Sequence, residues 1–257
     1  MIENLTTNDG RVANWWLARP EARNAVTLEM WDELGRLASQ VATNSHVRVV
    51  VIRGRGEHFS AGADIVGLGR ALAADADGST YRATNAATEA AISNLATPTI
   101  AAIDGYCIGG GVQLALSCDI RIATHRAQFA VTPAKLGITY PANALRRLVA
   151  IVGPAIATEL VLTGTSIDAY RAREVGLVHH LVDDLDGAID AQVATLLKRS
   201  ALTQAATKAV IAAVIEAVDV NELGREWERR SLSHGDVDEG LSAFVNKREP
   251  RFGDRPI

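Results

Sequence analysis

A chain of 257 residues, 48% of them hydrophobic, is long enough to bury a full core in one or two domains. Its 26 lysines and arginines nearly balance 30 aspartates and glutamates, and the net charge is −4. No basic block or acidic tail appears, which argues against a nucleic-acid partner. The two cysteines, Cys107 and Cys118, argue against a disulfide scaffold and a four-ligand zinc site, and no metal is expected.

The first residues, MIENLTTNDGR, lack a basic stretch followed by an apolar one, so no signal peptide is predicted. No run of about 18 uncharged apolar residues occurs, and no membrane span or membrane partner is expected. We therefore expect a cytoplasmic protein.

Strands and helices alternate along the first hundred residues. A strand is predicted over 11–18, followed by a helix over 27–44 with Thr27 as its N-cap. The β-branched run 47–54 predicts a strand buried on both faces. Residues 55–69 are predicted as a glycine-rich loop, 81–95 as a helix and 97–105 as another apolar strand.

The second half begins with the same alternation and ends in helices alone. A short helix is predicted over 112–117 and a strand over 118–123. Further helices are expected at 142–152 and 154–162, and a short strand at 176–182. From residue 185 onward the pattern is helical, at 185–200, 203–217, 221–233 and 237–247. The layout predicts an α/β core with a helical C-terminal part.

Two loops, GEHFSAGADI and GYCIGGG, each follow a buried strand, where ligands of α/β folds usually bind. Gly110 stands where a helix begins, and the first N–H groups of a helix have no partner within it. A second N–H from the AGAD loop could face the first, and two such donors make an oxyanion hole. Two tight turns are the simpler alternative. A phosphate loop is disfavoured because no Gly-Lys-Ser/Thr follows.

Six stretches in register resemble the crotonase (enoyl-CoA hydratase/isomerase) superfamily over almost the whole chain. They are RPEARNAV, FSAGADI, AAIDGYCIGGGVQLALSCDIRIA, QFAVTPAKLGI, ATELVLTG and EGLSAFVNKREPRF. The resemblance implies an α/β fold with a ββα spiral core, assigned to residues 1–195, and a helical trimerisation region at 196–257. It also implies a homotrimer or hexamer that acts on an acyl-CoA thioester, with coenzyme A as part of the substrate and no other cofactor.

In the superfamily, the thioester oxygen rests on two backbone N–H groups, which by resemblance belong to Ala63 and Gly110. Family hydratases carry two glutamates, where this chain has Gln113 and Pro133. Neither residue can transfer a proton, and general acid–base catalysis is typically worth about 10²–10⁴-fold. Efficient water addition is therefore not expected. Gln113 could still orient a water or a carboxylate, or simply line a wall.

The loop TPAKLGITYP resembles that of methylmalonyl-CoA decarboxylases, so Tyr140 would hydrogen-bond a substrate carboxylate or the enolate. Decarboxylation generates the enolate without a base, which suits a site without acids. Those decarboxylases have a histidine in place of Ala63 and a glutamate in place of Gln113. A tyrosine that only fills the core is the alternative. The predicted function is a decarboxylase or another specialised lyase on a CoA thioester.

Two other functions stay open. One is a hydratase or isomerase with relocated acids, for which Glu89 and Tyr140 are the first candidates. Glu89 lies on the 81–95 helix, where surface exposure is the expectation and a replacement carboxylate the alternative. The other is a non-catalytic acyl-CoA binding protein. His58 and His125 are expected to have structural or surface roles.

The resemblance also implies where coenzyme A binds. Arg23 and Ala25 would line the entrance, and Arg23 suits a phosphate because it is permanently charged. The main chain of the next loop would contact adenine, through Ala61, Asp64 and Ile65. Phe244 and Lys247 of the C-terminal helix would reach the nucleotide, often from a neighbouring subunit.

Overall fold

The computed structural model describes residues 1–74 and 79–253 and has a six-stranded central sheet in the order β1-β2-β3-β4-β6-β9. Its strands are β1 (Ile2–Thr7), β2 (Val12–Leu17), β3 (Val49–Gly54), β4 (Thr99–Ile103), β6 (Ile120–Thr124) and β9 (His180–Val182). β1 pairs antiparallel with β2, and every other neighbouring pair in this sheet is parallel. Parallel pairing brings the carboxyl ends of the strands, and the loops that follow them, to one edge.

Three short strands form a second sheet in the order β5-β7-β8, namely β5 (Tyr106–Ile108), β7 (Gln128–Ala130) and β8 (Ile167–Asp168). The sequence analysis did not predict them, nor β1 or the short helix α6 (Ala169–Glu174). Strands of two or three residues are too short to display an alternating pattern. β5 matters for the site because it leads directly into α4 (Gly110–Leu116).

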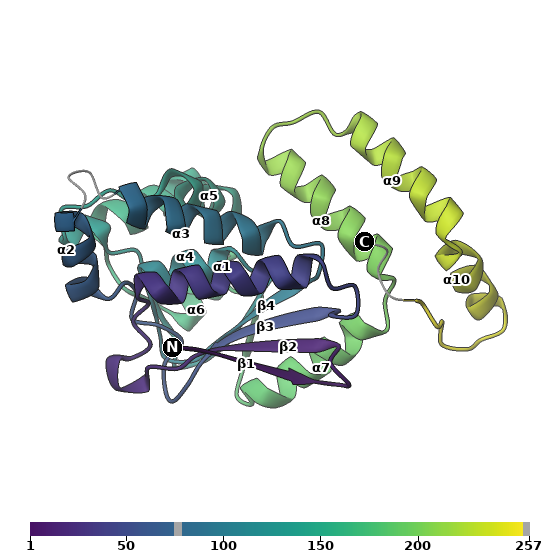
Figure 1. Cartoon of the computed structure of the whole chain (residues 1–257), viewed down its shortest axis with the longest axis horizontal. Helices are drawn as coiled ribbons and strands as arrows, with labels where there is room; N and C mark the ends of the chain where they lie inside the picture. The colour runs from purple at the N-terminus through teal and green to yellow at the C-terminus, as the bar shows by residue number, and fades with distance from the viewer. Residues whose placement is uncertain (75–78, 254–257) are drawn as a thin grey trace.

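The core lies on both faces of the central sheet, as Figure 1 shows. On one face, α1 (Leu28–Ala42), α3 (Ser79–Ser93), α4 and α5 (Ala142–Thr163) pack into a single apolar cluster with Val50 and Ile52. On the other face, α7 (Leu185–Leu197) covers Val49 and Val51. β3 is therefore buried on both faces, which confirms the prediction made from its β-branched run.

Local features of the chain set the start of α1 and the break within α5. Thr27 is the N-cap of α1, as predicted, and its Oγ1 accepts a hydrogen bond from the amide of Met30 at 3.3 Å. The two helices predicted over 142–162 together make up α5. The backbone between them is not helical at Gly153 (φ 77°, ψ 162°), directly before Pro154. The break leaves the two halves with the bounds that the sequence predicted, within about two residues.

The prediction of a loop throughout 55–69 is wrong at its end, because α2 (Ile65–Ala74) begins inside it. The helix starts where Asp64 Oδ1 accepts a hydrogen bond from the amide of Gly67 at 2.9 Å. Gly67 and Gly69 disfavour a helix by about 1 kcal/mol each, and for that reason a loop was predicted where α2 begins.

Three helices extend from the core at the C-terminal end: α8 (Ala201–Ile215), α9 (Asn221–His234) and α10 (Asp236–Val245). Figure 1 shows α9 folding back alongside α8, with α10 continuing beyond it, and we call these three helices the arm. Each of them lies within two residues of its predicted bounds. Among the described residues, no helix is long and apolar enough to cross a membrane.

Candidate functional site

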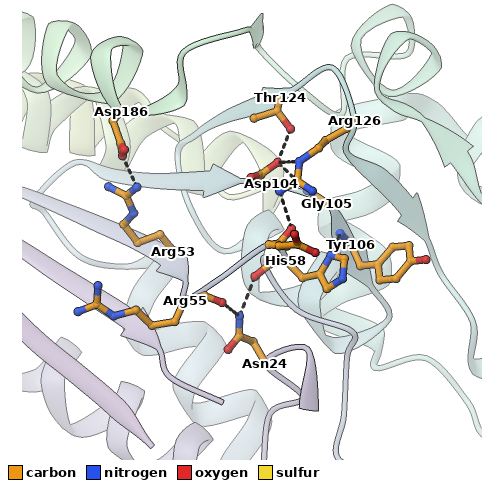
Figure 2. Close-up of polar contacts among 11 residues, drawn as sticks. Asn24, Arg53, Arg55, His58, Asp104, Gly105, Tyr106, Thr124, Arg126 and Asp186 are labelled. Carbon is orange, nitrogen blue, oxygen red and sulfur yellow. Dashed lines mark hydrogen bonds and ion pairs between the residues drawn. The ribbon is translucent and has the colours of Figure 1, made fainter. Parts of the chain in front are cut away.

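Asn24 ties together the two loops that lead to the site. Its backbone is left-handed (φ 55°), and its Oδ1 accepts a hydrogen bond from the amide of Arg19 at 2.9 Å. Its Nδ2 donates to the carbonyls of Arg55 at 2.9 Å and His58 at 2.7 Å (Figure 2). A single side-chain amide thus holds the 19–26 segment against the loop that follows β3. Val26 continues this contact as an isolated parallel bridge with Ala63.

Asp104, just after β4, anchors the same loop from the other side. Its Oδ1 accepts hydrogen bonds from the amide of Gly105 at 3.0 Å, from the hydroxyl of Thr124 at 2.6 Å and from Arg126 Nε at 2.7 Å (Figure 2). Arg126 also donates to the carbonyl of Glu57 at 3.0 Å. Although burial alone would raise the pKa of Asp104, the hydrogen bonds from Arg126 and Thr124 outweigh it and lower the pKa.

The amide nitrogens of Ala63 and Gly110 belong to neighbouring turns. A Cβ built on Gly110 would lie 3.3 Å from the nitrogen of Ala63, and one built on Gly62 would lie 3.4 Å from the nitrogen of Gly110. Within residues 1–74 and 79–253, neither amide donates a hydrogen bond to another backbone group. Gly110 is also the first residue of α4, where the helix dipole favours negative charge. The arrangement can therefore present two free donors to one carbonyl oxygen.

Gln113 lies three residues after Gly110, on the first turn of α4, and its side chain is buried. Its Nε2 donates a short hydrogen bond to Oδ1 of Asn85 on α3. Gln113 is therefore a satisfied polar residue, in contact with a second helix. Sequence reasoning did not single out Asn85.

Glu89 is completely buried, with 0% of its surface exposed, so the expectation of a surface position is wrong. It lies one helical turn after Asn85, on the face of α3 that packs against α4 and α5. Its Oε1 is 3.2 Å from an Arg147 nitrogen. Burial raises the pKa of Glu89, while the side chain of Gln113 and the charge of Arg147 partly oppose that rise.

Tyr140 lies just before α5, and its hydroxyl is buried without a hydrogen-bond partner among the described residues. Burial raises its pKa well above the ordinary value, and the nearby Glu89 and Cys107 add to that rise. The structure thus brings Tyr140 to the same interior cluster as Glu89 and Gln113. Pro133, where family hydratases have their second glutamate, is buried at the start of a short 3-10 helix (Pro133–Lys135).

The residues expected at the coenzyme A entrance lie on the two tied loops. Arg23 is exposed and left-handed (φ 49°), and its guanidinium lies 5.5 Å from the ring centre of Tyr106, which stacks on His58. The amide of Ala61 donates to the carbonyl of Arg23 at 2.8 Å, and that of Asp64 donates to Val26 at 3.0 Å. These two amides are engaged inside the fold, and the main-chain contacts with adenine that the resemblance implies stay a prediction.

The other residues expected at this entrance are Ala25, Ile65 and the side chain of Asp64. Asp64 pairs with Arg19 at 2.9 Å, and Arg19 also donates to the carbonyl of Ala25 at 2.8 Å. The amide of Ala25 donates to the carbonyl of Ala22 at 3.0 Å. Ile65, at the start of α2, has an exposed side chain. Its apolar surface is available to a flat ring.

Phe244 and Lys247 do not meet the other predicted residues within this chain. Phe244 is 85% exposed on α10, and Lys247 lies two residues beyond that helix. Figure 1 places α10 at the opposite end of the molecule from α2, where Ile65 lies. Their contact with the nucleotide, which the resemblance places in a neighbouring subunit, stays a prediction.

His58, His125 and the two cysteines contact other parts of the protein or lie buried within it. His58 Nδ1 accepts a hydrogen bond from the amide of Tyr106 at 3.2 Å, and His125 lies 3.6 Å from Asp183. Both thiols, of Cys107 and Cys118, are buried, and burial raises their pKa. No group of three or more potential metal ligands occurs in the part of the chain that the structure describes.

Comparison with known proteins gives one family throughout. The sequence pattern of enoyl-CoA hydratase/isomerase proteins matches residues 7–255. A protein named probable enoyl-CoA hydratase from Mycobacterium tuberculosis is 34% identical, covering 98% of both chains. The 2,3-dehydroadipyl-CoA hydratase of Escherichia coli is also 34% identical, over 99% of this chain and 100% of its own. A crystal structure of an enoyl-CoA hydratase from Bacillus anthracis superposes with a TM-score of 0.90 at 30% identity, covering 98% of both chains.

Proposed function

This chain belongs to the enoyl-CoA hydratase/isomerase family, and from that premise we propose that it holds the enolate of a CoA thioester between the amides of Ala63 and Gly110. It has the α/β crotonase fold and is an acyl-CoA-processing enzyme. The proposal concerns which atoms carry the chemistry and which reaction follows.

One observation carries the proposal: two free backbone amides lie side by side where two loops meet at the ends of parallel strands. Enolate formation puts negative charge on the thioester oxygen. Two donors fixed in place stabilise that charge without having to reorganise, and losing one of them typically costs about 10²–10³-fold in rate. Gly110 leaves the approach to both amides open because it has no side chain.

The reaction we propose is decarboxylation, or another lyase reaction that breaks a bond next to the thioester. Gln113 and Pro133 replace the two carboxylates with which family hydratases position water, and neither can transfer a proton. Loss of CO₂ from the carbon next to the thioester leaves the bonding electron pair on the enolate directly. The buried, unpartnered hydroxyl of Tyr140 is available to donate a hydrogen bond to a substrate carboxylate or to the enolate.

A hydratase or isomerase with relocated acids is the second candidate, and the burial of Glu89 beside Gln113 favours it. Relatives of this chain include proteins named as hydratases and proteins named as dienoyl-CoA isomerases. A carboxyl group in this position could move a proton between two carbons of an unsaturated acyl chain. The two candidates differ in substrate, so they can be separated directly.

The test is to incubate the pure protein with methylmalonyl-CoA, crotonyl-CoA and a 3-enoyl-CoA and to follow the products by mass spectrometry. We expect loss of CO₂ from methylmalonyl-CoA and no rapid hydration of crotonyl-CoA. Rapid hydration or isomerisation without decarboxylation would replace the first candidate by the second. Binding without turnover across a broad panel of CoA esters would show a non-catalytic acyl-CoA binding protein.

Several wider expectations stay part of this proposal. Coenzyme A enters as part of the substrate, with no further cofactor. We propose a spiral core over residues 1–195 and an oligomerisation region over 196–257, in a cytoplasmic homotrimer or hexamer. Phe244 lies on α10, at the opposite end of the molecule from α2, and this arrangement supports an oligomer in which another subunit supplies Phe244 and Lys247 to the nucleotide.

A further inference from the structure

A buried polar cluster joins three helices behind the free amide of Gly110. α3 contributes Asn85 and Glu89, α4 contributes Gln113, and α5 contributes Arg147, with Tyr140 just before α5. Asn85 and Glu89 are four residues apart and so lie on one helix face. Gln113 is three residues from Gly110, a rise of about 4.5 Å along the helix. Gln113, the member of the cluster on α4, is therefore within one helical turn of the Gly110 amide.

Two atoms of this cluster have no hydrogen-bond partner in the described part of the chain. They are Oε2 of Glu89 and the hydroxyl of Tyr140, and both are buried. Buried polar groups normally find a partner, because an unmade hydrogen bond costs about 1–3 kcal/mol. Glu89 and Tyr140 are close enough for the charge of one to affect the other, yet they do not bond to each other. A ligand group between them would satisfy both.

A purely structural role for Glu89 explains the contact of Oε1 and leaves Oε2 unexplained. Arg147 lies 3.2 Å from its Oε1 and also donates to the hydroxyl of Ser93 at 2.7 Å, which ties α5 to α3. A buried ion pair is weak evidence for stability, because desolvation offsets the attraction between the charges. The pair also leaves Oε2 without a hydrogen-bond partner among the described residues. A function that uses Oε2 accounts for both oxygens.

We propose that Glu89 is the proton donor of this site, giving its proton to the α-carbon of the enolate held by Ala63 and Gly110. The inference rests on the proposed function, since it needs an enolate at those amides. It deepens that function by supplying the acid that Gln113 and Pro133 do not provide.

The step balances without any further reactant. The bond between the α-carbon and CO₂ breaks, and its electron pair becomes the enolate with its charge on the thioester oxygen. The enolate α-carbon then takes the proton of the Glu89 carboxyl, the thioester carbonyl reforms, and Glu89 is left as a carboxylate. Arg147, 3.2 Å away, stabilises that carboxylate until it regains a proton from water after the product leaves.

The surroundings favour the protonated form of the Glu89 carboxyl more than water does. Burial raises the pKa of Glu89, and no carboxylate from α4 or α5 is among the groups that act on it. The groups that face it are the uncharged Asn85, Gln113 and Tyr140 and the cation Arg147. Burial favours the protonated carboxyl that gives up the proton, and the charge of Arg147 favours the carboxylate that is left.

The experiment measures hydrogen exchange at the α-carbon of butyryl-CoA in D₂O by mass spectrometry. Butyryl-CoA has no carboxylate to lose and no double bond to hydrate, so exchange reports proton transfer alone. We expect Glu89→Gln to slow exchange at least about 100-fold and to leave the dissociation constant of butyryl-CoA within about threefold. Glu89→Asp, which keeps the acid but shortens it, should retain a measurable intermediate rate.

Two further variants separate chemistry from folding. Glu33→Gln removes an exposed glutamate that also pairs with an arginine, Arg36, and should exchange like the unmodified protein. The double variant Glu89→Gln/Arg147→Met removes both charges, so that no unpaired charge stays buried. It provides a folded test if Glu89→Gln alone does not fold, and its exchange should be equally slow.

A second probe distinguishes the two proposals. Acetoacetyl-CoA loses its acidic α-proton to solvent, so its enolate absorbance on binding reports the two amides without needing Glu89. An enolate band retained by Glu89→Gln together with slow exchange supports the inference. If the enolate band is present but the unmodified protein shows no exchange, Glu89 is not the proton donor. The same holds if the band is present and Glu89→Gln exchanges as fast as the unmodified protein. Either result leaves the proposed function standing. No band in the unmodified protein overturns the proposed function, and this inference with it.

Discussion

At the scale of single residues, Gly110 shows why the chain has no side chain beside the free amides. A Cβ there would lie 3.3 Å from the nitrogen of Ala63, closer than ordinary van der Waals contact. Gly224, on α9, provides the contrast, since a Cβ there would meet nothing within 4 Å. The same substitution therefore has opposite consequences at the two positions.

Gly110→Ala should lower the turnover of a CoA thioester at least about tenfold, because its Cβ pushes the Ala63 amide out of line with the oxygen it binds. The thermal midpoint should hardly change, since alanine is a better helix former than glycine. Gly224→Ala is the matched control and should keep full activity with equal or higher stability. Steady-state rates and thermal melts of the three proteins check this. Equal rates for both variants would remove Gly110 from the site.

Some residues of the candidate site could be found from the sequence, and the burial of Glu89 could not. Ala63, Gly110 and Gln113 were singled out by the resemblance of their motifs, and the start of a helix was a second signal for Gly110. Glu89 was placed wrongly on the surface, because its helix reads as polar and alanine-rich. The spacing of Asn85 and Glu89 was a usable signal for one face. That this face is buried depends on α4 and α5, which are distant in sequence.

At the scale of elements, the two loops that carry the free amides depend on anchors outside the site. Asn24 holds the loop after β3 from one side and Asp104 from the other (Figure 2). Asp104 accepts hydrogen bonds from Gly105, Thr124 and Arg126, so its carboxylate form is stabilised in the folded protein. Its lowered pKa links this anchoring to pH.

Asp104→Asn should destabilise the fold at pH 7 by about 1–3 kcal/mol, because charge-assisted hydrogen bonds to Arg126 are lost. An aspartate whose pKa is lowered by folding stabilises above its unfolded pKa of about 3.9 and loses that contribution as the pH falls. The gap between the two proteins should therefore shrink as the pH drops below about 4.

Urea unfolding at pH 7 and near pH 3 measures that gap. Asp183→Asn is the control, since Asp183 is 99% exposed and its loss should change stability little at either pH. A constant gap between Asp104→Asn and the unmodified protein at both pH values would contradict the assignment.

At the scale of the whole molecule, the arm exposes more apolar surface than a solitary chain should. Large side chains on all three of its helices face solvent, among them Val214, Leu232 and Leu241. Large apolar side chains that gather exposed on one part of a protein often mark an interaction site. Together with the position of α10 at the opposite end of the molecule from α2, it supports our expectation of a homotrimer or hexamer.

Leu232→Glu/Leu241→Glu should shift the protein toward smaller species, because both leucines are exposed in the single chain, at 72% and 62%, and a charge cannot be buried cheaply. The affinity for CoA should fall with it, since Lys247 would no longer be supplied by a neighbour. Light scattering coupled to size exclusion, with a CoA titration, measures both. Leu5→Glu, on the opposite edge of the core, is the control. A single-chain mass for the unmodified protein would contradict the prediction.

The sequence alone determined the features that neighbouring residues control. Strand β3, the cap of α1, the helices of the arm and the glycine turn before α4 all follow from periodicity, capping and backbone freedom within a few positions. The tertiary structure alone decided which polar side chains meet. Glu89, Gln113, Tyr140 and Arg147 come from separate elements, and their contact depends on how those elements pack. Packing is a long-range property, because each helix is buried by partners that its own sequence does not name.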